Sequence, residues 1–397
     1  MAKLPPGDPA PSDGALPPSA LNPEAPLSLY LHVPFCRVRC GYCDFNTYTP
    51  NELGDVDQEG FLGAALAELD LARRLVGPRR VTTVFVGGGT PTMLPPAALT
   101  GLLAAMRERF EFAPDAEVTT EANPETLTPA VLAALREGGF TRLSLGLQSV
   151  VPHVLRVLER VHTPSRGVDA ARWAREAGFE HVSLDLIYGT PGESLDDWRA
   201  SLDAVTAAPV DHVSAYSLIV EEGTRLARQV RRGEIAMPDD DDLADKYEMA
   251  DDALTALGFA SYEVSNWSLP GGECRHNLAY WRGGDWWGIG PGAHSHLNGV
   301  RFWNRKHPRS YAAALAAGES PALAREVLTA EERRVERVLL ELRIVDGLPL
   351  DVLTPSERGR VGDVVASGLA ELIPGDRLRL TRAGRLLADG VVRDLLD

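Results

Sequence analysis

Three of the four cysteines in this 397-residue chain stand close together, as Cys36, Cys40 and Cys43. Four cysteines in a chain of this length do not form a disulfide framework. The cluster of three therefore indicates metal or redox chemistry. A zinc site needs four ligands, and only Cys274 and scattered histidines offer a fourth. A thioredoxin-like pair leaves the third cysteine unexplained. An iron–sulfur cluster takes thiolates from a short loop, and three thiolates leave one iron open to an exchangeable ligand. The spacing favours the cluster.

A second set of candidates follows strand-like runs further along the chain. Glycines in 87–90 allow close backbone approach, and their N–H groups can form a nest for an acceptor. Asp185 lies inside an apolar strand, where a lone carboxylate must be paired or functional. Glu121, Gln148 and Arg160 have a plainer alternative, as solvated residues at a strand end or on a helix. Because the C-terminal ends of parallel strands meet at one rim, we expect all of them to lie together.

The CxxxCxxC spacing directly after a first strand resembles the radical S-adenosylmethionine (SAM) superfamily, in which SAM binds the open iron of a [4Fe–4S] cluster. The longer string YLHVPFC, from Tyr30 to Cys36, resembles one branch, the oxygen-independent coproporphyrinogen oxidases and their relatives. The resemblance extends from about residue 27 to the C-terminus. It implies a [4Fe–4S] cluster on Cys36, Cys40 and Cys43, with SAM as cofactor. By the same resemblance the other cofactor-binding residues are Tyr30, Tyr42, Gly88, Gly89, Thr90, Glu121, Gln148, Arg160 and Asp185.

Two features depart from the oxidases and resemble a heme-chaperone subgroup of this branch. The oxidase pattern is CxxxCxxCxC, and Phe45 stands at the position of its last cysteine. Residues 276–281 (HNLAYW) resemble the HNxxYW motif of the chaperones. This resemblance implies heme as a further cofactor, bound through His276. Neutral imidazole is a good axial ligand, and the rings of Tyr280 and Trp281 suit a porphyrin face.

On this interpretation the protein is a heme chaperone rather than an enzyme. Its partners are heme and a heme-acceptor protein, such as a membrane-bound respiratory enzyme. Three alternatives stay open at this point. The chain is instead an oxygen-independent coproporphyrinogen III oxidase; His276 is a core histidine bonded to a neighbour; or Cys274 takes part as a thiol ligand or thioether link.

The elements that position these residues alternate along the chain. Strand-like runs are expected at residues 27–33, 81–86, 117–120, 142–147, 181–187 and 212–219. Helix-like segments are expected at residues 60–75, 96–110, 129–137, 164–177, 194–207 and 241–257. Repeated strand–helix units with buried apolar strands predict an α/β fold with a parallel sheet, either doubly wound or barrel-like. The resemblance implies a partial (β/α)6 TIM-like barrel of the radical SAM type.

The chain is expected to divide unevenly. Residues 1–26 hold eight of the 29 prolines and predict a disordered leader. The radical SAM core spans 27–261, and 262–325 form a segment rich in tryptophan, glycine and histidine. An amphipathic helix and a hairpin in 326–397 predict a winged-helix-like C-terminal domain.

Charge and hydropathy exclude several classes of partner. The formal net charge is −16, which argues against non-specific binding to nucleic acid or anionic membranes. No apolar run is long enough to span a bilayer, so we do not expect an integral membrane protein. The N-terminus lacks the apolar region of a secretory signal, so the expected location is the cytoplasm.

Overall fold

The computed structural model describes residues 6–53, 57–160, 163 and 165–396. At its centre, six parallel strands lie side by side in sequence order. They are β2 (Leu27–Val33), β3 (Arg80–Gly88), β4 (Glu111–Ala122), β5 (Arg142–Gln148), β6 (His181–Tyr188) and β7 (His212–Ser217). Sequential order without reversal is the order of a barrel and not of a doubly wound sheet. Because β2 and β7 do not pair with each other, the barrel is partial, and the expected fold class is confirmed.

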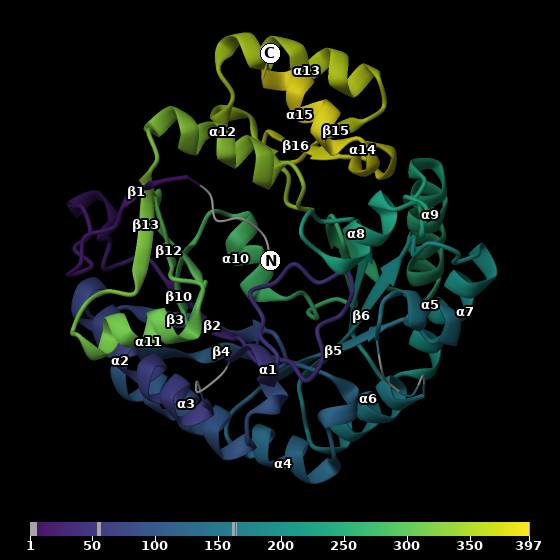
Figure 1. Cartoon of the computed structure of the whole chain (residues 1–397). Helices are drawn as coiled ribbons and strands as arrows, with labels where there is room; N and C mark the ends of the chain where they lie inside the picture. The colour runs from purple at the N-terminus through teal and green to yellow at the C-terminus, as the bar shows by residue number, and fades with distance from the viewer. Residues whose placement is uncertain (1–5, 54–56, 161–162, 164, 397) are drawn as a thin grey trace.

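Helices between the strands cover the outside of this sheet and form an outer arc in Figure 1. They are α2 (Gln58–Val76), α3 (Pro96–Arg109), α4 (Pro129–Glu137), α6 (Arg166–Glu176), α7 (Leu195–Ala207) and α9 (Asp240–Ala256). Shorter helices are α1 (Pro50–Leu53), α5 (Pro152–Val157) and α8 (Arg225–Arg231). Their starts follow local chemistry: the Thr128 hydroxyl accepts from an amide of α4, and Ser194 and Asp197 form a capping box at α7.

Residues 262–325, which the sequence suggested were a separate segment, contribute strands that continue the barrel sheet. Its strands are β10 (Asp285–Ile289), β11 (His294–Leu297), β12 (Val300–Asn304) and β13 (Ala322–Val327). β10 pairs in parallel with β2, and the next three strands follow in antiparallel order. At the other edge β9 (Asn266–Ser268) and β8 (Ala260–Glu263) follow β7. Trp287 and Phe302 belong to the same hydrophobic core as the barrel strands.

The prediction of a disordered leader is wrong for residues 6–26, while 1–5 lie outside the described residues. Strand β1 (Asp8–Pro9) pairs with β13 at the edge of the sheet, where proline is tolerated. Ala20 is fully buried in the barrel core. The Arg79 guanidinium, itself ion-paired to Asp285, donates to the Ala25 and Pro26 carbonyls. Composition alone missed these contacts because they are made with residues distant in the sequence.

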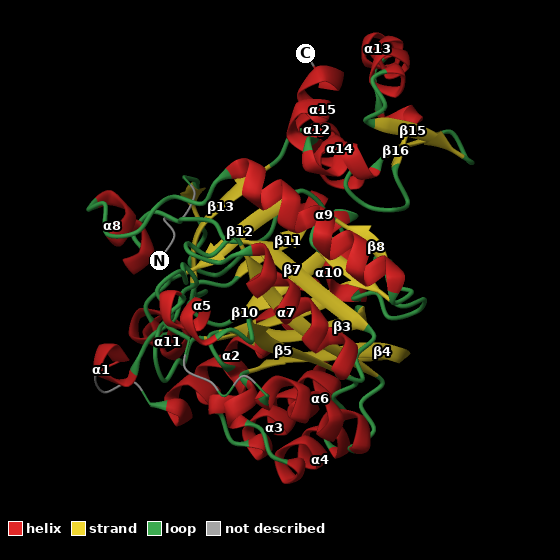
Figure 2. Cartoon of the chain, turned by 90° about the vertical axis from the view of Figure 1, so that its right-hand side faces the viewer, coloured by secondary structure: helices red, strands yellow, loops and turns green. Residues whose placement is uncertain are grey.

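The C-terminal residues build a second, smaller hydrophobic core above the barrel (Figure 2). Its helices are α12 (Ala330–Glu341), α13 (Pro355–Ala366), α14 (Arg382–Leu386) and α15 (Ala388–Leu396). A three-stranded antiparallel sheet joins β14 (Leu348–Pro349), β16 (Arg377–Leu380) and β15 (Ala370–Ile373). The helix and hairpin expected there are present, and a winged-helix relationship stays a prediction. None of the helices described is long and apolar enough to cross a bilayer.

Candidate cofactor-binding site

A cavity of about 1180 Å³ lies at the C-terminal ends of the barrel strands. Every site residue expected from the sequence lines it. These residues are Tyr30, Cys36, Cys40, Tyr42, Cys43, Gly88, Gly89, Thr90, Glu121, Gln148, Arg160, Asp185 and His276. They come from three loops, five strands and a helix, and parallel strand direction brings the ends of the five strands to one rim.

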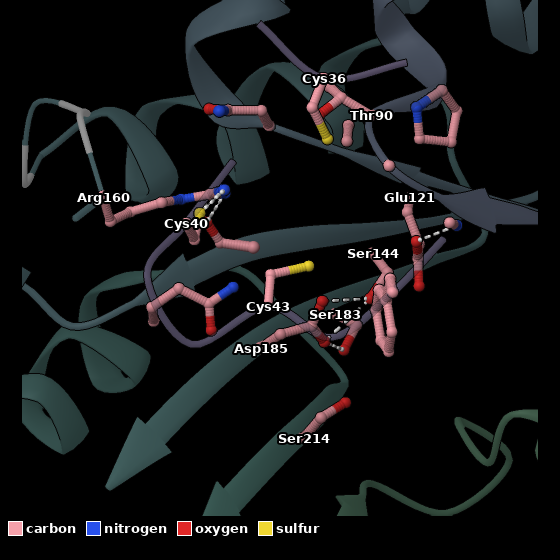
Figure 3. A pocket seen from close by; sticks show the side chains of 18 of the residues that line it. Cys36, Cys40, Cys43, Thr90, Glu121, Ser144, Arg160, Ser183, Asp185 and Ser214 are labelled. Carbon is pink, nitrogen blue, oxygen red and sulfur yellow. Dashed lines mark hydrogen bonds between the residues drawn. The ribbon is translucent and has the colours of Figure 1, made fainter. Parts of the chain in front are cut away.

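The cysteine loop follows β2 and is held in place by backbone hydrogen bonds at both ends. The Cys36 amide donates to the Tyr48 carbonyl, and Gly41 bonds to Leu158 and Leu226. All three thiols are half-buried and lie around one open space in Figure 3. In the described part of the chain, no three His, Cys, Asp or Glu side chains converge closely enough to hold a single metal ion. Thiols that share a cavity without meeting at one point suit a multi-iron cluster, which takes each thiolate at a different iron.

Burial makes the Cys36 and Cys43 thiols reluctant to ionise on their own. It raises the pKa of Cys36, and it raises the pKa of Cys43 to about 12. Arg160 is the cation beside them, with Nη1 3.8 Å from the Cys40 sulfur and Nη2 donating to the Gly146 carbonyl. Its Nε is buried and has no hydrogen-bond partner among the described residues, so it is a donor that an acceptor on a bound group would satisfy.

The glycine loop (residues 87–90) shapes the wall of the cavity. The prediction that its amides form a free nest is wrong, because they already donate within the protein. The N–H groups of Gly88, Gly89 and Thr90 donate to Glu121, Val33 and Phe35 respectively. Gly88 has a positive φ of 109°, and a Cβ there would lie 2.7 Å from the His32 ring. A Cβ on Gly89 would lie 2.5 Å from the Phe35 carbonyl oxygen. The glycines are therefore needed so that this loop can pack against the cysteine loop.

Two carboxylates lie deeper in the cavity, on β4 and β6. Burial, and then the charge of Asp185, raise the pKa of Glu121 to about 8, although the Gly88 amide donates to it. Burial also raises the pKa of Asp185, against hydrogen bonds from Ser144, Ser183 and Ser214 (Figure 3). Such carboxylates offer acceptors for hydroxyl or cationic groups of a ligand.

The sequence interpretation missed these three serines. Each lines the cavity from a strand, in β5, β6 and β7 respectively. Polar residues at matching positions of neighbouring strands were the signal that could have found them, since β5, β6 and β7 are adjacent.

Gln148 ends β5 in an unusual backbone conformation. Its φ is 65°, in the left-handed region that side chains other than glycine rarely adopt. Strain of this kind persists where the surrounding structure enforces it, commonly at functional sites.

The HNLAYW segment forms helix α10 (Arg275–Trp281), whose residues His276, Asn277 and Tyr280 line the cavity. Glu117 of β4, ion-paired at 3.0 Å to the buried Arg142, accepts from the amides of Arg275 and His276. Cys274 is buried, with its sulfur 3.6 Å from a Glu117 oxygen. These contacts attach α10 to the barrel wall.

His276 itself is fully buried, and both of its ring nitrogens have partners. Nδ1 lies 2.8 Å from the Thr83 hydroxyl, which in turn donates to Ser28. Nε2 lies 2.8 Å from the Tyr280 hydroxyl, because residues four apart lie on the same face of a helix. Because Thr83 uses its proton toward Ser28, this network assigns the imidazole proton to Nδ1, and the Nε2 lone pair faces Tyr280.

Comparison with known proteins agrees with this geometry. Residues 30–205 match the family described as the radical SAM superfamily. The chain is 57% identical over 381 residues to the heme chaperone HemW of Mycobacterium tuberculosis (strain H37Rv), covering 96% of this chain and 97% of the relative. It is 37% identical over 291 residues to the heme chaperone HemW of Escherichia coli K12, covering 72% and 75%.

Among solved structures, the chain is similar to coproporphyrinogen III oxidase (HemN) from E. coli, a radical SAM enzyme. The TM-score is 0.80 at 25% identity, over 95% of this chain and 91% of the other. The sequential parallel barrel with a cysteine loop after its first strand thus defines a protein of the radical SAM class. Within that class, the chain belongs to the HemW family.

Proposed function

We propose that this protein is a heme chaperone, which binds heme and transfers it to an acceptor protein. The observation that carries the proposal is 57% identity over nearly the full length to a HemW heme chaperone. Two features of the chain support it: Phe45 at the position of the oxidases' last cysteine, and an aromatic helix beside the cavity. The acceptor we expect is a membrane-bound respiratory enzyme, reached from the cytoplasm.

We further propose a [4Fe–4S] cluster on Cys36, Cys40 and Cys43, with SAM exchanging at its open iron. The bound cluster would supply an iron that holds the amino and carboxylate groups of SAM. Arg160 would offset the negative charge of the thiolates, since it lies 3.8 Å from one of them. Glu121 would accept hydrogen bonds from hydroxyl groups of SAM.

Hemin titration of the purified protein tests the chaperone proposal directly. We expect a saturable change in the Soret band, with the same endpoint in the presence and absence of SAM. Transfer is then tested by mixing loaded protein with an apo-acceptor and following the two heme spectra. A linear, non-saturating response to hemin would refute the proposal.

The likeness to the HemN structure favours one second candidate, oxidative decarboxylation of coproporphyrinogen III. An anaerobic assay with SAM and a reductant distinguishes the two functions. We expect no protoporphyrinogen, because Phe45 replaces the cysteine of the oxidase pattern. Steady formation of that product would make the protein an oxidase.

The cysteine assignment predicts a sharp loss of iron. Replacing Cys40 by alanine removes one of three ligands, so the variant should lose the cluster and its brown colour. Cys274→Ala is the matched control, because this buried cysteine points to Glu117 and away from the loop. Iron and sulfide analysis after anaerobic reconstitution measures both. Full iron content in Cys40→Ala would show that the ligands are different.

A further inference from the structure

A second cavity, of about 850 Å³, opens beside the first, and none of the three loop cysteines lines it. Its volume lies in the range of cofactor-sized pockets. The two cavities share walls formed by Tyr30, Phe45, Gly88, Glu121, Asn277 and Tyr280. Phe45, the residue that replaces the oxidases' cysteine, is 55% exposed on this shared wall. The tryptophans Trp281, Trp286 and Trp303 also line the second cavity.

This second cavity has the surfaces that a porphyrin needs. Flat aromatic rings offer large apolar contact area to a flat macrocycle. Arg301 and Lys306 line the same cavity and offer cations for the two carboxylates of heme. Arg301 is ion-paired at 3.1 Å to Glu336 and at 3.5 Å to Glu326, which also line this cavity, so a heme carboxylate would compete with these two side chains for its guanidinium.

The motif of α10 meets this cavity through three of its residues, and His276 is not among them. Asn277, Tyr280 and Trp281 line the second cavity. His276 lies behind them with no solvent exposure. Its Nε2 lone pair is occupied by the Tyr280 hydroxyl, so binding to iron would require breaking this buried hydrogen bond.

The imidazole of His294 is better placed than that of His276 to bind the iron of a heme in this cavity. His294, at the start of β11, is exposed and lines the second cavity. Among the residues described, neither of its ring nitrogens has a hydrogen-bond partner. Its ring stacks on Trp303 with centroids 5.8 Å apart and planes 25° apart. Trp286 Nε1 donates to the His294 carbonyl at 3.0 Å, which holds the backbone beneath the ring.

The charge state of His294 also suits an iron ligand. Although His294 as a residue is exposed, its ring is partly desolvated, and this, followed by the nearby charge of Lys306, lowers its pKa below the ordinary value for histidine. A lowered pKa keeps the imidazole neutral at pH 7, and neutral imidazole is the form that binds a metal.

We propose that His294 supplies the axial nitrogen to heme in this second cavity, and that His276 is a positioning residue that orients Tyr280. The bond is a simple coordination, in which a lone pair of the neutral ring binds the iron and no proton or electron is transferred. The inference rests on the proposed heme-binding function and assigns its ligand to a different strand from the motif that the sequence indicates.

The test is a hemin titration of the wild type and three variants, read by absorbance and by electron paramagnetic resonance of the ferric form. His294→Ala should lose the signature of a nitrogen-ligated heme, with affinity falling about tenfold or more, a change of about 1.4 kcal/mol or more. His276→Gln should keep the wild-type signature. His153→Ala is the control, because this exposed histidine lies outside both cavities and pairs only with Asp197 among the described residues.

A rescue experiment separates ligation from a structural effect. In His294→Gly, added imidazole should restore the nitrogen-ligated spectrum, whereas it should change nothing in His276→Gln. Circular dichroism and iron content matching the wild type would show that the variants are folded. Failure of imidazole to restore the spectrum of a folded His294→Gly would overturn the proposal.

The outcomes are distinct. If His276→Gln loses the nitrogen-ligated signature and His294→Ala keeps it, the ligand is His276 and the proposal is wrong. If both variants keep the signature, the proposal is also wrong. If the wild type itself binds no hemin, the proposed chaperone function fails before any variant is considered.

Discussion

At the level of single residues, burial decides how Glu121 behaves. Its carboxyl group lies near Asp185, and together with burial this raises its pKa to about 8. An unfolded chain returns the pKa to the ordinary value for glutamate, near 4.5. Between these values the folded state binds more protons than the unfolded state, so the free energy of unfolding falls as the pH rises. The ionised Glu121 carboxylate therefore lowers the stability of the fold, as is common for residues at functional sites.

Glu121→Gln removes this titration and keeps an oxygen that can accept from the Gly88 amide. We expect the variant to be more stable than the wild type at pH 8 to 9, and the difference to shrink as the pH falls and to vanish below about 4.5, where Glu121 is protonated in both the folded and the unfolded wild type. Thermal unfolding of both proteins across this pH range measures the difference. A difference that is constant with pH would show that Glu121 has an ordinary pKa.

At the level of elements, one hydrogen-bonded chain attaches α10 to the barrel. Ser28 on β2, Thr83 on β3, His276 and Tyr280 follow one another through side-chain contacts of 2.8 Å. The chain ends at a phenol that lines both cavities. A small change at β3 should therefore reach the aromatic wall through His276.

Thr83→Val keeps the side-chain shape and removes the hydroxyl. The buried Nδ1–H of His276 then loses its acceptor, which should cost about 1–3 kcal/mol of stability. Thr83→Ser is the matched control, because it retains the hydroxyl. Thermal unfolding measures the stability, and Tyr280 environment is followed by near-ultraviolet circular dichroism. Equal unfolding midpoints for the valine and serine variants would show that this tether contributes little.

At the scale of the whole molecule, the N-terminal segment crosses the sheet that supports the second cavity. A Cβ on Gly7 would lie 2.6 Å from the Trp303 ring and 2.8 Å from the Arg325 carbonyl. Trp303 in turn stacks on His294. Residues 6–26, here called the strap, are thus packed against β12 and β13 at the end of the barrel sheet.

Gly7→Ala should separate the strap from Trp303, lower the thermal midpoint and increase quenching of tryptophan fluorescence by acrylamide. Gly63→Ala is the contrasting control, since it lies on an exposed face of α2 with no heavy atom within 4 Å of a new Cβ. That change should stabilise by about 0.5–1 kcal/mol, because alanine is the better helix former. A Gly7→Ala protein as stable as the wild type would show that the strap packs loosely.

Much of the fold and the first site was predictable, because both depend on local patterns. Apolar runs separated by capped amphipathic helices predicted a parallel α/β sheet, and the family resemblance implied its barrel order; parallel direction then brings Cys36, Glu121 and Asp185 to one rim. The three serines around Asp185 and the use of the glycine amides were not predictable in this way. They depend on register between neighbouring strands and on the close approach of two loops.

The sequence by itself determined the parallel α/β class of fold and the cysteine loop, since these depend on spacing and short-range periodicity, and its motifs carried the resemblance to the family. Only the tertiary structure decided that β10 lies beside β2, that residues 6–26 are packed, and which histidine faces open space. Motif matching pointed to His276, whereas burial and two hydrogen bonds occupy its ring. The exposed His294 lies on a strand whose place is set by long-range pairing, and no local signal in the chain contains that information.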